Sequence, residues 1–438
     1  MGGSGYDGAA KSFNDHADVP EAGLRIAIDE ARKAANISRV VAINEVADVT
    51  VLREAHREMG IKDRSAEKQM PLVEQTKAKR AGIGLRACDH DRVFDGFTLF
   101  APQSGAGKVY LIDIDGTVVH TWQMPYPPGN SGYLTDRGTL FYNGKVIEQS
   151  DRFISRQPWK GGVALEADWN GRVLWEVRQP DHHHDGIRLR NGNLLLICLA
   201  QLPQHLVSQV KGGRPGTEHN GEMYADYLVE MTTDGRVVWQ WRTWEHLDPA
   251  TDCITAVQDQ REAWTHANGL AEMANGDIVV SFRNISTVII IDRKTDEIIW
   301  KLGAPPLSGQ HAPMPLPNGN LLLFDNGPHR LDHTMTFSRI IEVDLASKQI
   351  VWKYQEKREY EFYSPRISNA RRLPNGNTLV CEGDFGRFFE VTAEGELVWE
   401  YVNPYFGDGP NGPNNRVFRA YRYSAEEIAR AKATGGSQ

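Results

Sequence analysis

A hairpin pattern that recurs six times is the feature that most constrains the fold of this chain. Each copy is a β-rich run ending in or near an acidic residue, then a turn, then a second β-rich run closed by a tryptophan. The closing tryptophans are Trp122, Trp175, Trp239, Trp300, Trp352 and Trp399. Several turns contain Asn-Gly, Asp-Gly or Glu-Gly between Val and Ile runs, which indicates hairpins because Gly and Asn tolerate the positive φ that such turns need.

A second hairpin precedes most copies and carries an NGN or NGD turn. These turns lie near Asn191, Asn275, Asn318 and Asn375, with degenerate forms near Gly96 and Gly138. Two hairpins make four strands, which is one propeller blade, and a closed ring of six blades leaves few strand edges exposed. The sequence therefore predicts an all-β, six-bladed β-propeller over residues 85–423, in which the run around Phe418 completes the blade that begins near Phe94.

The segments outside the repeats have a different character. Residues 1–84 include two stretches with apolar residues at spacings of three and four and interleaved charges, which predicts a short N-terminal helical segment. We expect these helices to pack on the propeller rim or on a second copy of the chain, which would make a homo-oligomer. Residues 424–438 are expected to form a C-terminal tail.

Charge and hydropathy restrict the partners. The formal net charge of −8 argues against nucleic acid, which selects clustered basic surfaces. No apolar run approaches the roughly 20 residues of a membrane helix. The first thirty residues lack the basic start and apolar run of a signal peptide, so a cytoplasmic location is expected. A small organic molecule is the expected partner.

The register of the repeats indicates where chemistry would take place. Counting back seven residues from the inner turns reaches His184, Asn268, His311 and Ser368, and counting back nine reaches His182, His266, Gly309 and Arg366. Positions two apart share one face of a strand, and the innermost strand of each blade lines the central channel. A single strand histidine is usually structural, but histidines at matching positions of consecutive blades predict a site in the channel.

Arg283 strengthens this prediction, because it interrupts an otherwise apolar run and must find an anion or a carboxylate. Only alternate members of the run His182 to His184 are expected to point inward. His329 and His333 lie on a loop after a strand, where either a supporting role or plain exposure is possible.

Several motifs taken together resemble the bacterial aryl-sulfate sulfotransferase family over about residues 90–423. They are HHHDGIRLRNGN, WTHANGL, VVSFRNISTVIIIDRKTDEIIWKLG, SGQHAPMPLPNGNLLLFDNG and FSRIIEVD. The resemblance implies a six-bladed propeller whose channel carries three histidines and an arginine. It also implies transfer of a sulfuryl group between phenols through a sulfohistidine, without a nucleotide sulfate donor and without a cofactor.

Carried over residue by residue, the resemblance gives His266, Arg283, His311 and either His183 or His184. We expect His311 to be the nucleophile, Arg283 to bind the sulfate, and His184 and His266 to stabilise charge or exchange a proton. The candidate substrate-binding residues are His182, His183, Asn268, His329, Arg339 and Arg366.

Two departures from the family keep other functions open. No export signal is expected from the first thirty residues, and Ala312 follows His311 where the family commonly has an acidic residue, so the partner that orients His311 is in doubt. One alternative is a lyase or hydrolase acting on a phenolic compound in the same channel, with a divalent metal held by His182, His184, His266 and His311. The other alternative is a propeller that serves only as a binding scaffold.

Overall fold

The computed structural model describes residues 82–146, 159–331, 333, 335–408 and 412–436, together with Ile28, Lys33 and Ser38. The chain divides into two compact units, residues 1–70 and 71–438, and the propeller belongs to the second. Nearly all of the helical segment expected over residues 1–84 lies outside the described residues. No helix in the described part of the chain has the length and apolar character needed to cross a membrane.

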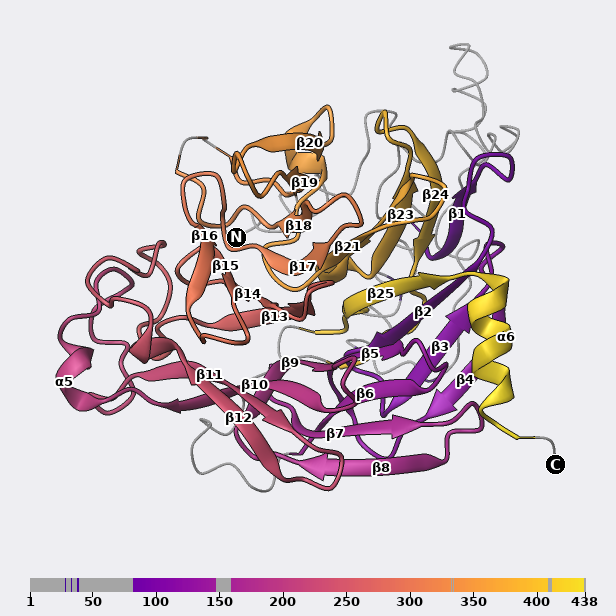
Figure 1. Ribbon diagram of the computed structural model, residues 1–438. Helices are drawn as coiled ribbons and strands as arrows, with labels where there is room; N and C mark the ends of the chain where they lie inside the picture. Colours follow the sequence, from indigo (N-terminus) through magenta and orange to yellow (C-terminus); the bar gives the residue numbers. More distant parts are fainter. Residues whose placement is uncertain are drawn as a thin grey trace, which may run out of the picture. The chain divides into compact units, whose positions relative to one another are not determined.

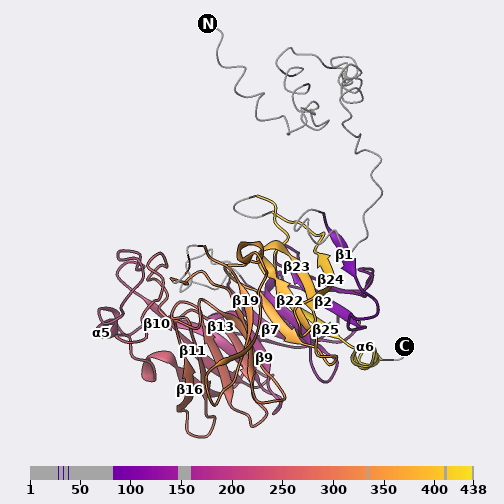
Figure 2. The same cartoon turned by 90° about the horizontal axis from the view of Figure 1, so that it is seen from above.

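The propeller consists of six antiparallel sheets, which we number as blades in chain order (Figures 1 and 2). From the inside outward, blade 1 contains β25 (Val417–Tyr423), β2 (Phe97–Pro102), β3 (Lys108–Ile112) and β4 (Val118–Gln123), and blade 2 contains β5 (Pro128–Leu134), β6 (Leu140–Lys145), β7 (Gly162–Ala167) and β8 (Val173–Arg178). Blade 3 contains β9 (His182–Arg188), β10 (Leu194–Gln201), β11 (Tyr224–Met231) and β12 (Val237–Arg242), and blade 4 contains β13 (Ala267–Glu272), β14 (Ile278–Phe282), β15 (Thr287–Ile291) and β16 (Ile298–Leu302). Blade 5 contains β17 (His311–Pro315), β18 (Leu321–Asp325), β19 (Arg339–Val343) and β20 (Ile350–Tyr354), and blade 6 contains β21 (Asn369–Arg372), β22 (Thr378–Glu382), β23 (Arg387–Val391), β24 (Leu397–Val402) and β1 (Gly84–Cys88).

The first strand of each sheet contacts the first strand of both neighbouring sheets, so β25, β5, β9, β13, β17 and β21 form an inner ring. The predicted six-bladed β-propeller is confirmed. Short helices occupy the connections and the C-terminus: α5 (Gln204–Val207), the 3-10 turns η4 (Thr243–Glu245), η5 (Glu359–Glu361) and η6 (Gly383–Phe385), and α6 (Ala425–Ala433).

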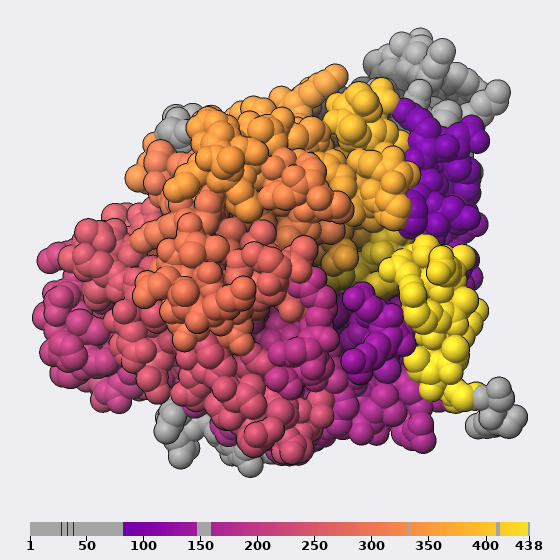
Figure 3. Space-filling view, viewed as in Figure 1, coloured from indigo at the N-terminus to yellow at the C-terminus, as the bar shows by residue number. Residues whose placement is uncertain are grey.

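The ring closes as the sequence predicted, by pairing distant parts of the chain. β25 is antiparallel to β2, with Ala420 opposite Phe100, so the last strand of the chain is the innermost strand of blade 1. In the space-filling view, the C-terminal segment lies directly against the first described residues of the propeller (Figure 3). β1 adds a further contact that the repeat pattern did not reveal, because it pairs with β24 as a fifth strand at the outer edge of blade 6.

Residues 424–438, expected to be a tail, contain helix α6. The side chain of Ser424 accepts a hydrogen bond from the Glu427 backbone, and Glu427 accepts one from the Ser424 backbone, which is a capping box. Ile428 and Ala431 are buried against the cluster of blades 1 and 2. Figure 1 shows α6 beside β25 and β4.

The hydrophobic core is divided into clusters between the blades. Six large clusters of buried residues occur, and each joins the facing sheets of one neighbouring pair of blades, blade 6 with blade 1 included. Burial therefore stabilises the ring only when all neighbours are present.

Tryptophan hydrogen bonds reinforce these boundaries. The indole N–H of Trp300 donates to the backbone oxygen of Leu345 in the next blade, and Trp352 donates in the same way to Ala393. Trp399 donates to Ile114, which links blade 6 to blade 1. The prediction that the closing tryptophans pack between blades is confirmed at these boundaries. In blade 3 the equivalent hydrogen bond does not come from the closing Trp239. It comes from Trp241, whose indole N–H donates to the backbone oxygen of Asp296 in blade 4.

Loss of β25 is expected to unfold the whole propeller. All seven of its residues are buried, and burying one large apolar side chain contributes about 1.5–3 kcal/mol. Four such side chains amount to about 6–12 kcal/mol, which is comparable with the entire stability of about 5–15 kcal/mol of a typical domain. A chain ending at residue 415 should therefore show no cooperative thermal transition by circular dichroism.

The matched control is a chain ending at residue 424, which keeps β25 and lacks only α6. We expect this control to melt cooperatively at a lower temperature. Equal melting of the two truncated chains would contradict closure through β25.

Candidate functional site

A cavity of about 430 Å³ lies where the strands of the inner ring begin. One residue within three positions of the start of each inner strand lines it: Asn130, His184, His266, His311, Ile367 and Phe418. Arg283 and Arg366 also line the cavity. The structure therefore brings together the four residues predicted to be catalytic, His184, His266, Arg283 and His311.

The backbone around this cavity is irregular in every one of blades 2 to 6. His184, His266, Ala312 and Ile367 have φ values of 49°, 55°, 51° and 50°, in the left-handed region that costs non-glycine residues about 1–2 kcal/mol each. The pairing register also shifts near these positions in β5, β9, β13 and β17. Strain and β-bulges of this kind concentrate at functional sites.

These bulges change which residues of the inner strands face the cavity. The expectation that positions two apart share one face fails here, because a bulge inserts an extra residue and turns the strand. His184 and His311 reach the cavity from one predicted position, whereas His266 reaches it from the other.

A chain of three buried groups ends at the cavity in His184. Oδ1 of Asp226 lies 3.0 Å from Nε2 of His183, and Nδ1 of His183 lies 2.7 Å from Nδ1 of His184. With Nε2–H of His183 directed at the carboxylate, a neutral His183 accepts the Nδ1–H of His184. Nε2 of His184 then carries a lone pair.

Asp226 is fixed from several sides. Its Oδ2 accepts hydrogen bonds from the Thr265 hydroxyl and from the Ala267 backbone at 2.8 Å. Although burial alone would raise it, the hydrogen bonds from His183 and Thr265 hold the pKa of Asp226 below its usual value. A buried, ionised carboxylate thus stands behind His184.

His311 is held in one tautomer by Asn326. The amide nitrogen of Asn326 donates to backbone oxygens of Ser364 and Ile367, so its Oδ1 faces Nδ1 of His311 at 2.8 Å. Nδ1 of His311 therefore carries the proton and Nε2 the lone pair, which accepts the Ile367 N–H at 3.2 Å. Asn326 supplies the orienting partner that Ala312 left in doubt.

Arg283 is positioned by the half-buried carboxylate of Asp259. Its Nη1 donates to Asp259 at 2.9 Å and to Asn284 at 3.0 Å, and Nε2 of His329 lies 2.8 Å from the same oxygen of Asp259. Burial alone would raise the pKa of Asp259, but the hydrogen bond from His329 and the charge of Arg283 lower it to about 2. The Nε and Nη2 atoms of Arg283 make no hydrogen bond within the described part of the chain.

The three cavity histidines are held neutral. Burial, reinforced by the positive charge of Arg283, lowers the pKa of His266 to about 3. Burial and the neighbouring His266 lower the pKa of His184 well below 6.5. Burial lowers the pKa of His311 well below the same value, although Asn326 opposes the shift. All three imidazole rings are therefore uncharged at neutral pH, and each has a lone pair on one ring nitrogen.

One wall of the cavity is aromatic. The ring of Trp159 stacks on His184 at 5.0 Å between centroids and meets His266 edge-on at 5.4 Å. Phe418 lies 6.4 Å from His184. An aromatic ligand would find flat, apolar surfaces beside the histidines.

The other predicted binding residues occupy different places. His183 and His329 stand behind the cavity and orient His184 and Arg283 as described. His182 is buried in β9, where its Nδ1 accepts the Gly162 N–H, and burial lowers its pKa to about 3.

Asn268 and Arg339 do not line this cavity. Asn268 donates to the Gln310 backbone, and Arg339 pairs with Asp325 at 2.7 Å. His333, left open by the sequence, is exposed and packs edge-on against Phe337.

A buried ion pair joins two strands of the inner ring. Arg419 of β25 donates to Asp185 of β9 at 2.8 Å and to the Asn268 backbone. Breaking one partner of such a pair typically costs about 3–5 kcal/mol. Arg419 of β25 therefore links β9 and β13 across the inner ring.

The metal alternative was tested against ligand geometry. Within the described ranges, only Cys88, His90 and Asp115 bring three ligand atoms within 4.8 Å of one another. That group lies outside the cavity. His182, His184, His266 and His311 do not form such a group, so the donor set does not fit a shared metal ion.

Comparison with known proteins adds to the geometry. The profile of the arylsulfotransferase (ASST) family matches residues 85–307 and 306–403, which is most of the propeller. The chain belongs to the arylsulfotransferase family. The resemblance seen in the sequence motifs is thereby confirmed.

Two curated arylsulfotransferase relatives align with the propeller. The chain is 22% identical over 370 residues to the arylsulfate sulfotransferase AssT of Escherichia coli O6:H1, and 23% identical over 368 residues to that of Lelliottia amnigena. Each alignment covers 64% of this chain and 58% of the relative, so the chain spans less than two thirds of the relatives' length. A crystal structure of a protein of unknown function from Bacteroides caccae has a TM-score of 0.49 and 14% identity, covering 75% of this chain and 99% of that one.

Sequence reasoning missed several residues in and around the histidine cavity, which is the cavity lined by His184, His266 and His311. Asp226 stands in the buried strand YADYLVEM, where a charged residue without a nearby partner is a signal like that of Arg283. Asn326 and Asp259 carry no comparable signal. Trp159 lies outside the repeated pattern, so the sequence does not indicate that it lines the cavity.

We expect the cavity histidines to remain neutral through mildly acidic pH. In NMR spectra of protein with ¹⁵N-labelled histidine, the ring signals of His184, His266 and His311 should not change between about pH 8 and about pH 6, because burial disfavours the imidazolium form. The same protein unfolded in urea should titrate near the ordinary value. Protonation of these rings near pH 6.5 in the folded protein would contradict this prediction.

Proposed function

We propose that the protein is an aryl-sulfate sulfotransferase, which moves a sulfuryl group from one phenolic compound to another through a sulfohistidine. The observation that carries the proposal is the convergence of three neutral imidazoles and Arg283 on a single cavity with an aromatic wall, which Arg366 and Arg416 also line. Membership of the arylsulfotransferase family supports it.

In this proposal the donor is an aryl sulfate rather than a nucleotide. The cavity volume of about 430 Å³ lies near the lower end of ligand pockets, which run from about 300 to 1,000 Å³. The aryl ring packs against Trp159 and Phe418, and the sulfate faces Arg283. The Nε and Nη2 atoms of Arg283 are available to the sulfate oxygens as a fork.

The first step forms the covalent intermediate. The Nε2 lone pair of His311 attacks sulfur in line, the N–S bond forms, and the S–O bond to the aryl group breaks, so the phenolate leaves with the bonding electrons. The positive charge that develops on the ring is stabilised by the Nδ1–H donated to Asn326. The Ile367 N–H, which lies 3.2 Å from Nε2, is placed to donate to an oxygen on that sulfur.

The second step regenerates the histidine. The acceptor phenol gives its proton to Nε2 of His184, its oxygen attacks sulfur, and the N–S bond breaks to return the electron pair to His311. The ionised Asp226 stabilises the resulting imidazolium of His184 through His183. The imidazole of His266, which makes no hydrogen bond to a described residue, contacts the sulfuryl oxygens or the phenol.

His311→Asn should abolish transfer and leave the fold intact, because an amide cannot form the N–S bond. The assay mixes protein with 4-nitrophenyl sulfate and an acceptor phenol, follows nitrophenol release, and searches for a sulfated histidine by mass spectrometry of the quenched enzyme. Arg283→Lys should lower kcat/KM by about tenfold or more, because a point charge cannot reproduce the guanidinium fork.

His90→Asn is the matched control, since His90 is exposed and lies outside the cavity. It should match the wild type. Wild-type protein that releases no nitrophenol and forms no adduct would rule out the proposal, as would an adduct that persists in His311→Asn.

Asp226→Asn should lower kcat by about tenfold for weakly acidic acceptor phenols, because general-base catalysis contributes typically about 10²–10⁴-fold and His184 retains its ring. Strongly acidic phenols are already ionised and need no base, so their rates should change little. The measurement is a plot of log kcat against acceptor pKa for both proteins. Equal loss for every acceptor would indicate that Asp226 has a structural role only.

A further inference from the structure

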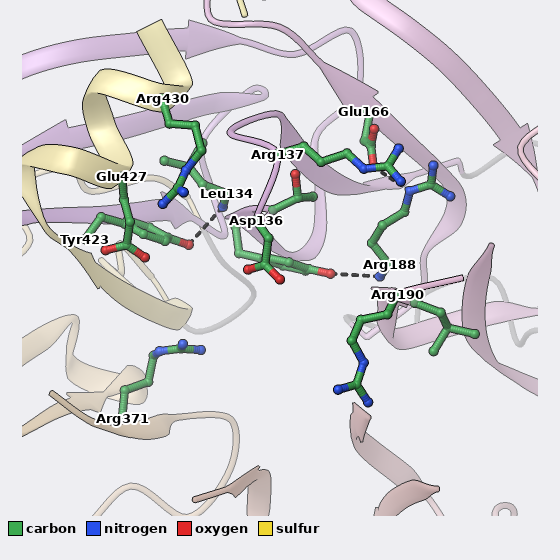
Figure 4. A pocket seen from close by; sticks show the side chains of 13 residues that line it. Leu134, Asp136, Arg137, Glu166, Arg188, Arg190, Arg371, Tyr423, Glu427 and Arg430 are labelled. Carbon is green, nitrogen blue, oxygen red and sulfur yellow. Dashed lines mark hydrogen bonds and ion pairs between the residues drawn. The ribbon is translucent and has the colours of Figure 1, made fainter. Parts of the chain in front are cut away.

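The opposite end of the channel contains a second concave site. A cavity of about 380 Å³ lies where the inner strands β5, β9, β21 and β25 end. It shares no lining residue with the histidine cavity, which is the cavity lined by His184, His266 and His311. Its lining includes five arginines: Arg137, Arg188, Arg190, Arg371 and Arg430 (Figure 4). We propose that this cavity, here called the arginine cavity, binds a small organic anion with two or more carboxylate or phosphate groups.

The arginines reach the cavity from separate parts of the chain. They come from the β5–β6 turn, from β9 and the turn after it, from β21 and from helix α6. The chain as a whole has a net charge of −8. A cluster of five arginines is therefore opposite in sign to the charge of the whole chain. Concave walls that carry one sign of charge focus the potential and concentrate ligands of the opposite sign.

Three of the five guanidinium groups are not engaged. Arg137, Arg371 and Arg430 make no hydrogen bond or ion pair with another described residue. Arg371 is nevertheless held in place, because its guanidinium lies over the Tyr421 ring at 5.1 Å. Figure 4 shows Arg371 and Arg430 projecting into the cavity from opposite sides.

Two tyrosine hydroxyls add donors at fixed positions. The hydroxyl oxygen of Tyr133 accepts the Arg188 N–H at 2.8 Å, and that of Tyr423 accepts the Leu134 N–H at 2.8 Å (Figure 4). With their oxygens already used as acceptors, both hydroxyls keep a proton to donate. Guanidinium and hydroxyl donors together match the oxygens of carboxylates and phosphates.

The carboxylates of the cavity do not cancel this charge. Glu166 is paired with Arg188 at 2.7 Å, and Arg190 is paired with Glu272 at 3.5 Å. One oxygen of Glu427 accepts the Ser424 N–H in the capping box of α6. The remaining charged groups of the cavity are the carboxylates of Asp136 and Glu427 and the guanidinium groups of the three other arginines. The net charge of the cavity lining is therefore positive.

The number of free guanidinium groups determines the ligand class. Each guanidinium binds one carboxylate or phosphate as a fork, and an anion with a single such group would leave the other arginines facing one another. A ligand with two or more acidic groups satisfies them together.

The test is isothermal titration calorimetry with citrate and with inorganic phosphate at an ionic strength of about 0.15 M, where non-specific attraction is screened. Wild-type protein should bind one equivalent of citrate, and more tightly than phosphate. Arg371→Gln, and the double variant Arg137→Ala with Arg430→Ala, should each weaken citrate binding by about tenfold or more. Arg137 and Arg430 are exposed, so the double variant should fold normally, which its melting curve checks.

Arg236→Ala is the matched control. Like Arg137, Arg236 is exposed in a hairpin turn next to a glycine, but it lies outside the cavity. It should bind citrate within about twofold of wild type. Arg283→Lys, which alters the histidine cavity, should also leave citrate binding unchanged.

Three results would overturn the proposal. They are the absence of citrate and phosphate binding to wild-type protein, equal weakening by Arg236→Ala, and loss of binding in Arg283→Lys with retention in Arg371→Gln. The last result would place the anion in the histidine cavity. The proposed sulfotransferase activity is measured separately and is unaffected by any of these outcomes.

Discussion

The pairing of β25 with β2 is the interaction on which the rest of the structure depends. Without it the inner ring would be open, and the apolar clusters at the two boundaries of blade 1 would lose residues from one wall. The same pairing places Phe418 at the histidine cavity and Arg419 in the ion pair with Asp185. Ring closure and site assembly are therefore one event.

The fold was predictable because its signals are local and repeated. The tryptophans at the ends of hairpins and the glycines in the turns recur in each blade. The first blade lacks one strand in this pattern, and the last β-rich run of the chain supplies it. β1 and α6 were missed for the opposite reason, since each occurs once and has no counterpart in another blade. The capping-box spacing from Ser424 to Glu427 was present but stood outside the repeats.

The site was predictable only in its first layer. His184, His266 and His311 stand out by their places in successive repeats, and Arg283 stands out because it follows an apolar run. The bulges that aim them are backbone features without a sequence signature of their own, and the period of two that placed them breaks at these bulges. Their partners, Asp226, Asn326 and Asp259, come from strands or loops far away along the chain, and only the folded ring brings them together.

The electrostatics of the two cavities are opposite in character. In the histidine cavity burial keeps three imidazoles uncharged, and the positive charge of Arg283 is balanced by Asp259. In the arginine cavity several guanidinium groups remain unbalanced. Both environments occur within one propeller because the two cavities have no lining residue in common.

The left-handed residues at the starts of the inner strands have a consequence for evolution. Each of these positions belongs to a separate blade and is aimed by the backbone of that blade alone. A substitution at one position changes one functional group of the cavity and leaves the aim of the others untouched. A ring built in this way can change the chemistry of its cavity one blade at a time.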